Sequence, residues 1–187
     1  SAILKTLQLA KDNQVAISFD AGFPTGEGQE AKDSVKKAMA LADIIKLNLL
    51  ELIYWNKQIS PENDEITKDI SLLYESPPSS GLESDGNTCI KDIPEEILVK
   101  LAKTIFDRYR PAILTVTMAA EGSFVLTDNE HINAGVFEVD TVAGVGAGDA
   151  YIAGFIHKLS ADCDRENLSQ YLQELNHEQL VEASRYA

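Results

Sequence analysis

A glycine-rich run that ends in an acid is the part of this chain that most directly suggests chemistry. Residues 144–149 read Gly-Val-Gly-Ala-Gly-Asp and precede an apolar segment with helical spacing. Backbone amides in such a loop can approach an anion, and the start of a helix adds about half a positive charge. The carboxylate of Asp149 is poorly suited to hold phosphate, but it can accept a proton from a hydroxyl that attacks a phosphoryl group. The pattern therefore favours a phosphate site with Asp149 as general base.

Two other interpretations apply to the same run. It can be a tight turn in which Asp149 caps the following helix or lies in its first turn. It can also be compared with the GxGxxG fingerprint of dinucleotide-binding proteins. Here, however, single residues separate the glycines, and no acid closes a second strand about 20 residues further on. The dinucleotide interpretation is the weaker of the two.

Asn48, Glu51 and Asp20 are polar residues that follow or end apolar strands. An Asn at a helix start with Glu three residues later forms a capping box, which is a sufficient structural reason for Asn48 and Glu51. At the carboxyl edge of a parallel sheet, the same two side chains can hold water around a magnesium ion that is bound to phosphates. Asp20 ends another strand and points to the same edge, although such acids also form turns.

Alternating strand and helix patterns must position these residues. Apolar runs predict strands at 15–20, 43–47 and 112–117, and helical spacing predicts helices at 2–10, 30–42, 48–55 and 97–106, with a further apolar helix after Asp149 through residues 152–159. Such alternation indicates a parallel sheet covered by helices on both faces. Residues 123–126 and 135–139 predict two further strands, which are expected to be antiparallel.

The segment 56–96 differs from the rest of the chain. It carries ten acids, three bases and four of the six prolines, so half of the net charge of −14 lies in it. So little apolar surface does not offset the entropy of ordering. We expect a flexible acidic insertion there.

Composition excludes several classes of protein. The length of 187 residues suits one domain. The charge of −14 disfavours nucleic acid as a partner, and no run approaches the ~18 apolar residues of a membrane span. Cys89 and Cys163 show no metal-ligand or disulfide spacing, which favours a reducing compartment. Together with the lack of a signal-peptide pattern, this predicts a cytoplasmic protein.

Four segments, in this order, resemble motifs of the ribokinase-like PfkB carbohydrate kinases, and of fructokinases most closely. They are Ile-Ser-Phe-Asp at 17–20, similar to FDxN; Lys-Leu-Asn-Leu-Leu-Glu at 46–51, similar to KxNxxE; residues 115–122, similar to TxGxxG; and Asp140-Thr141 with Gly-Ala-Gly-Asp-Ala at 146–150, similar to DTxGAGDA. The resemblance covers nearly the whole chain.

The resemblance implies a ribokinase-like three-layer α/β/α sandwich with a mostly parallel central sheet. Residues 1–187 would be the central and C-terminal part of that domain, without its N-terminal lid and sugar-binding part and without its extreme C-terminus. The implied reaction transfers the γ-phosphoryl group of ATP to a sugar hydroxyl, with Mg²⁺ and a monovalent cation as cofactors. The implied partners are sugar and ATP, with a homodimer formed through the lid.

The resemblance also implies a role for each motif residue. Asp149 is the expected catalytic base. The other roles are as follows: Gly146, Ala147 and Gly148 form the anion hole beside Gly144, Asn48 and Glu51 contact magnesium and phosphate, Thr117 and Gly122 line the nucleotide, and Asp20 faces the substrate.

Several motif positions differ from the family pattern. Residues 142–144 look like a three-residue insertion before GAGD, Ala21 and Gly22 replace Pro-Asn, and Ala119 replaces the first glycine of TxGxxG. These differences support a second hypothesis, in which the protein is a catalytically weak or inactive kinase-like binding or scaffold protein that uses residues 56–96 as a contact segment.

Overall fold

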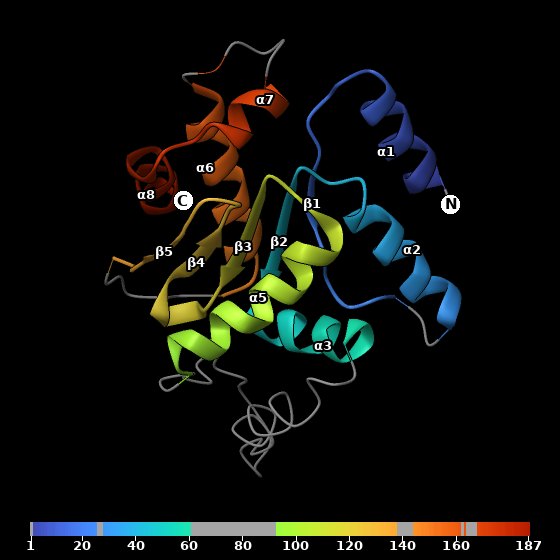
Figure 1. The fold of residues 1–187 in the computed structure, drawn as a ribbon, viewed down its shortest axis with the longest axis horizontal. Helices are drawn as coiled ribbons and strands as arrows, with labels where there is room; N and C mark the ends of the chain where they lie inside the picture. Colours follow the sequence, from blue (N-terminus) through green and yellow to red (C-terminus); the bar gives the residue numbers. More distant parts are fainter. Residues whose placement is uncertain (1, 26–27, 61–92, 138–143, 162, 164–167) are drawn as a thin grey trace.

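The computed structural model describes residues 2–25, 28–60, 93–137, 144–161, 163 and 168–187. A five-stranded sheet in the order β1-β2-β3-β4-β5 lies between helices (Figure 1). The strands are β1 (Ser18–Asp20), β2 (Ile44–Asn48), β3 (Ile113–Thr117), β4 (Ser123–Leu126) and β5 (His131–Ala134). The helices are α1 (Ala2–Asp12), α2 (Gln29–Met39), α3 (Leu49–Ile59), α5 (Glu95–Tyr109), α6 (Ala147–Ala161), α7 (Leu168–Gln173) and α8 (His177–Tyr186), with a short 3-10 helix at Ala119–Glu121.

The first three strands are parallel, so their carboxyl ends meet at one edge of the sheet. Asp20 lies opposite Lys46 across β1 and β2, and Asn48 lies opposite Thr117 across β2 and β3. β4 runs antiparallel to β3, and β5 returns antiparallel to β4. Four of the five strands therefore point the same way, and the mostly parallel α/β/α architecture is confirmed.

Two apolar clusters fill the space between the layers. Alternate residues of a strand point to opposite faces, so Ile45 and Leu47 of β2 pack with α1, α2, α3 and α5. Ile44 points to the other face and packs with α6, α7 and α8. Lys46 shares the Ile44 face and is the buried charge of β2. None of the helices among the described residues is long and apolar enough to cross a membrane.

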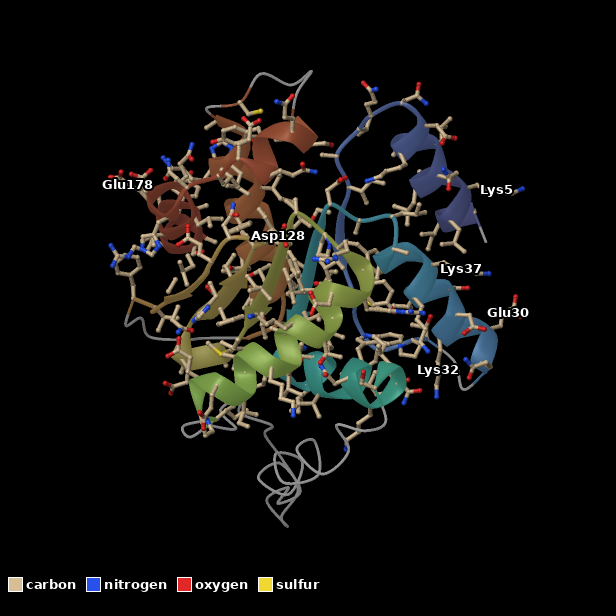
Figure 2. All side chains as sticks on the ribbon, in the orientation of Figure 1. Lys5, Glu30, Lys32, Lys37, Asp128 and Glu178 are labelled. Atoms are coloured by element: carbon tan, nitrogen blue, oxygen red, sulfur yellow. The ribbon has the colours of Figure 1, made fainter. Side chains whose placement is uncertain are left out.

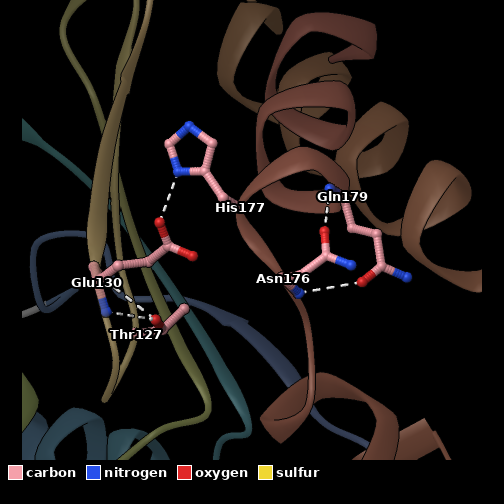
Figure 3. A network of polar contacts seen from close by, with 5 residues as sticks. All are labelled: Thr127, Glu130, Asn176, His177 and Gln179. Atoms are coloured by element: carbon pink, nitrogen blue, oxygen red, sulfur yellow. Dashed lines mark hydrogen bonds and ion pairs between the residues drawn. The ribbon is translucent and has the colours of Figure 1, made fainter.

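A polar network joins the C-terminal helix to the β4–β5 hairpin (Figure 3). Glu130 Oε2 lies 2.6 Å from His177 Nδ1, and the Thr127 hydroxyl is hydrogen-bonded to the backbone of Glu130 at 3.2 Å. Asn176 and Gln179 cap α8 reciprocally, each accepting a backbone N–H of the other at 3.0 Å. The His177–Glu130 contact joins α8 to the antiparallel part of the sheet, away from the carboxyl edge of β1 and β2.

The predicted strand at 135–139 is wrong at residues 135–137, and residues 138–139 lie outside the described residues. The fifth strand is His131–Ala134, and residues 135–137 are not in a strand. The Thr127–Glu130 turn closes a tight hairpin, so β5 begins directly after it and places Ile132 and Ala134 inward. The alternating pattern of β5 contains only two inward apolar residues, Ile132 and Ala134. The stretch after Gly135 is more apolar, and the strand was therefore predicted there.

The predicted insertion at 56–96 is wrong at both ends. Helix α3 continues to Ile59, and α5 already begins at Glu95. Asn56 is fully buried because its Nδ2 donates to the carbonyl oxygens of Leu52 and Leu101, at 2.9 and 3.0 Å. The Asn56 Oδ1 is buried without a hydrogen-bond partner among the described residues, so only the amino group of this amide is satisfied. A polar side chain buried between two helices explains why polar composition alone gave the wrong boundary. Residues 61–92 of the predicted insertion lie outside the described residues.

Candidate active site

The capping box predicted at Asn48 and Glu51 is present. The Glu51 backbone N–H donates to Asn48 Oδ1 at 2.9 Å, and Glu51 Oε2 accepts the Asn48 N–H at 2.6 Å. The box starts α3 directly at the end of β2, because Asn48 is both the last strand residue and the N-cap. It also fixes both side chains at the carboxyl edge of the parallel strands.

Glu51 is a buried carboxyl group in a charged environment. Burial is the largest effect and raises its pKa, while the Asn48 N–H opposes this; Asp20 raises it further and Lys46 lowers it. Asp20 and Lys46 are therefore close enough to Glu51 to act on its charge. The second carboxylate oxygen, Oε1, faces Gly22, where an added Cβ would lie 3.6 Å away. Within the described part of the chain, Oε1 carries no hydrogen bond.

Lys46 connects β1 to β2 by an ion pair. Its Nζ lies 2.8 Å from Asp20 Oδ2, and its side chain is only 6 % exposed. The lysines of the outer helices, such as Lys5 and Lys37, project outward instead (Figure 2). A lysine is rarely buried without a partner, because desolvation of the ammonium is costly. Lys46 was not predicted as a site residue; the available signal was a lysine inside the apolar run Ile-Ile-Lys-Leu.

The glycine-rich run reaches the same edge through Gly148. A Cβ added to Gly148 would lie 2.7 Å from Lys46 Nζ, so the first turn of α6 rests on the lysine ammonium. Asp149 follows in this first turn and is exposed. Gly146 has a φ of 84°, a left-handed conformation that favours glycine. The run is thus a turn into a helix, which the phosphate-site interpretation and the tight-turn interpretation both required.

A second contact between α6 and the sheet, made by Tyr151, was not predicted from the sequence. The Tyr151 hydroxyl lies 2.8 Å from Thr115 Oγ1. Burial raises the pKa of Tyr151, while the Ser123 and Thr115 hydroxyls and the Lys46 charge act in the opposite direction. The phenol is therefore a neutral hydrogen-bonding group between α6 and β3. From sequence, Tyr151 has the spacing of an ordinary apolar helix residue.

Two residues predicted to line the nucleotide lie where β3 ends and β4 begins. Thr117 is the partner of Asn48 in β2 and of Ser123 in β4, so it lies at the same edge as the capping box. Gly122 has a φ of 93°, and a Cβ there would lie 2.0 Å from the Ala134 carbonyl oxygen. Packing against β5 is thus a sufficient structural reason for this glycine.

The described structure brings most predicted site residues to one edge. Asp20, Asn48 and Glu51 share it with Gly148, Asp149 and Thr117. Gly144 and Gly146 are exposed in the turn before α6, with open space where a Cβ would lie. Asp140 and Thr141 of the predicted DTxGAGDA motif lie outside the described residues.

The residues present fit a phosphate-bound magnesium ion and not a protein-only metal cage. Among the described residues, no cluster of three or more His, Cys, Asp or Glu side chains has the arrangement of a metal site. Mg²⁺ keeps several waters and needs one or two carboxylates when phosphates supply the other oxygens. Glu51 Oε1 is such an oxygen, and Asp20 is the neighbouring carboxylate.

Comparisons with known proteins agree with this architecture. A fructokinase from Xylella fastidiosa with bound ATP superposes with a TM-score of 0.66 at 19% identity, covering 98% of this chain and 46% of that one. A fructokinase from Vibrio cholerae O395 with fructose, ADP and calcium gives 0.62 at 20% identity, over 98% and 46%. An aminoimidazole riboside kinase from Salmonella enterica gives 0.59 at 17% identity, over 100% and 48%. The chain spans slightly less than half the length of these structures.

The sequence comparisons address the family. A search of curated protein sequences finds no significant match. The model of the pfkB family carbohydrate kinases matches residues 83–181, which is more than half of the chain and includes the whole of α5, the antiparallel hairpin and α6 with Asp149. Because the family match covers more than half of the chain, this chain belongs to the pfkB family of carbohydrate kinases.

Proposed function

We propose that the protein is an ATP-dependent sugar kinase of the fructokinase type, which transfers the γ-phosphoryl group of ATP to a sugar hydroxyl. One observation carries the proposal. The first turn of α6, with Gly148 and Asp149, rests on Lys46 at the edge where the Asn48–Glu51 capping box lies. Family membership supports the carbohydrate kinase class, and the geometry supports the assignment of roles.

The start of α6 presents backbone N–H groups at an edge that also carries the Lys46–Asp20 ion pair and the carboxyl groups of Glu51 and Asp149. Exposed backbone N–H groups at a helix start attract phosphate. The Lys46 ammonium is paired with Asp20 and only 6 % exposed, so the α6 amides are the proposed phosphate-binding groups. Phosphoryl transfer depends mainly on positioning and on stabilising the charge of the transferred group. The net charge of −14 is no obstacle, because the field that the phosphate meets is local.

Asp149 is the group proposed to accept the proton of the sugar hydroxyl. Its carboxylate lies in the first turn of α6 and is exposed, so a substrate can reach it. A base on the residue after Gly148 stands next to the amides that would hold the phosphoryl group. This proximity allows proton removal and phosphoryl transfer to occur at the same place.

Asn48 and Glu51 are proposed to act on magnesium and phosphate. When bound, Mg²⁺ would neutralise the charge of the nucleotide phosphates at Glu51 Oε1. Burial disfavours the ionised form of Glu51, and a nearby cation would relieve this cost. A binding or scaffold protein has no physical need for Asn48, Glu51 and Asp149 together, which argues for catalysis over the scaffold hypothesis.

The experiment that tests the proposal is a coupled ADP-release assay on full-length protein with a panel of sugars, with and without a monovalent cation. Sugar-dependent ADP release with ATP and Mg²⁺ is the expected result. Nucleotide binding is measured in parallel by calorimetry. Nucleotide binding without turnover on any sugar would contradict the kinase proposal and favour the scaffold hypothesis.

A further inference from the structure

Helix α6 contacts the sheet through a polar row next to the apolar core. Lys46 and Thr115 are register partners in β2 and β3, so they lie side by side on the face that α6 covers. Gly148 lies over Lys46, and Tyr151 is hydrogen-bonded to Thr115. Residues 148 and 151 are three apart and share one face of the helix. The first turn of α6 is therefore seated on the close approach of Gly148 to Lys46 and on the hydrogen bond between Tyr151 and Thr115.

The glycine at 148 is required by Lys46 and not by the backbone. Gly148 lies within helix α6 and has no left-handed φ, unlike Gly122 and Gly146. The atoms that an added Cβ would meet belong to Lys46: Nζ at 2.7 Å and Cε at 3.5 Å. The first distance is a clash, and the second is an ordinary van der Waals contact.

The Lys46 ammonium cannot yield cheaply to such a clash. It is the end of a flexible side chain, but it is buried and bound to Asp20 at 2.8 Å, so moving it away from Gly148 strains this ion pair. Removing the partner of a buried charge is costly. Strain at Gly148 would therefore be transferred to α6, which has to move away from the sheet.

We propose that Lys46, held by Asp20, is a positioning residue that sets the height of the α6 first turn above the sheet. The α6 amides and Asp149 keep their distance from the Asn48–Glu51 box because Gly148 rests directly on the ammonium. This inference rests on the proposed function, since it explains how the proposed base and anion site are held in place. Nothing in it requires Lys46 itself to touch the substrate.

The test is a double-mutant cycle with Gly148→Ala and Lys46→Met. Methionine keeps an unbranched apolar chain to the Cε position and lacks the ammonium, so the alanine at 148 then meets only the ordinary contact. We expect Gly148→Ala to lower kcat by about 100-fold in the wild-type background, because a displacement of about 1 Å at a reacting group costs that much. We expect it to change kcat by less than about 2-fold in the Lys46→Met background. Lys46→Met alone should lower kcat and leave the KM for ATP unchanged.

A second readout does not need turnover. The melting temperatures of the same four proteins form a thermal cycle, in which Gly148→Ala should destabilise the wild type and leave Lys46→Met nearly unchanged. If the wild type has no kinase activity, the proposed function fails while this thermal cycle still decides the positioning role. Equal effects of Gly148→Ala in both backgrounds would overturn the proposal. If Gly148→Ala folds only when Lys46→Met is also present, the proposal is supported. If Lys46→Met folds alone but Gly148→Ala folds in neither background, the ammonium is not the obstacle and the proposal fails.

Discussion

Replacing Asn48 separates its structural role from its proposed functional role. Asn48→Ala removes the Oδ1 atom that accepts the Glu51 N–H at 2.9 Å, and leaves that donor unsatisfied in a partly buried site. Loss of an N-cap costs about 0.5–2 kcal/mol, and partial burial places this case near the middle or upper part of that range. A loss of about 1 kcal/mol lowers the melting temperature of a chain of this size by about 2–4 °C.

The chain offers a matched control for this variant. Asn176 and Gln179 form the same reciprocal box at the start of α8, away from the proposed site (Figure 3). Asn176→Ala removes an equivalent cap, so urea and thermal unfolding should give a similar or slightly smaller loss of stability. Its kinase activity should stay close to that of the wild type, because α8 does not contribute to the proposed phosphate edge.

Asn48→Ser provides the decisive comparison. Serine is as good an N-cap as asparagine, so unfolding should return close to the wild-type free energy. The amide group is still missing, and kcat/KM in the ADP-release assay should stay as low as in Asn48→Ala. If Asn48→Ser restored activity together with stability, Asn48 would be only a cap and its proposed contact with magnesium and phosphate would be wrong. Unfolding of Asn48→Ala at the wild-type midpoint would refute the capping argument itself.

Two further predictions concern stability. Glu51→Gln should keep the capping box, since Gln179 fills the same position in α8. Burial raises the pKa of Glu51 above 4.5, so the folded state binds its proton more tightly and wild-type stability falls as pH rises above this value. The gain in unfolding free energy from Glu51→Gln should therefore be larger at about pH 7 than below pH 4.5, and a difference independent of pH would contradict the assigned burial effect. Gly122→Ala should cost more than about 3 kcal/mol in urea unfolding, because its φ is +93° and its Cβ would lie 2.0 Å from the Ala134 oxygen. The control Gly135→Ala meets no atom within 4 Å and should stay within about 0.5 kcal/mol of wild type; equal losses in the two variants would refute the packing argument.

The architecture was predictable because its signals are local. Apolar runs at β2 and β3 and the helical spacing of α5 survive in the structure with shifts of up to three residues at their ends. The fifth strand was misplaced because a tight hairpin, and not hydrophobicity, decides where it begins. The start of the insertion was misplaced because Asn56 is buried through hydrogen bonds to backbone carbonyls of two helices, which no local pattern reveals.

The candidate site was predictable only in part. Asn48, Glu51 and Asp149 carry motif and capping signals that can be read along the chain. Lys46 could be quoted as part of a motif, but its role depends on Asp20, which is 26 residues away, and on Gly148, which is about a hundred residues away. The Tyr151–Thr115 contact spans 36 residues. Such contacts become visible only when the parallel strands and α6 are assembled.

The kinetics of Asp149→Asn test the central claim most directly. Asparagine has almost the same shape but cannot accept the proton, so kcat in the full-length protein should fall by about 10²–10⁴-fold with the dissociation constant for ATP unchanged. The exposed Asp128, in the hairpin turn, gives the control Asp128→Asn, which should retain wild-type kcat. An Asp149→Asn protein that phosphorylates sugar at the wild-type rate would contradict the assignment of the base.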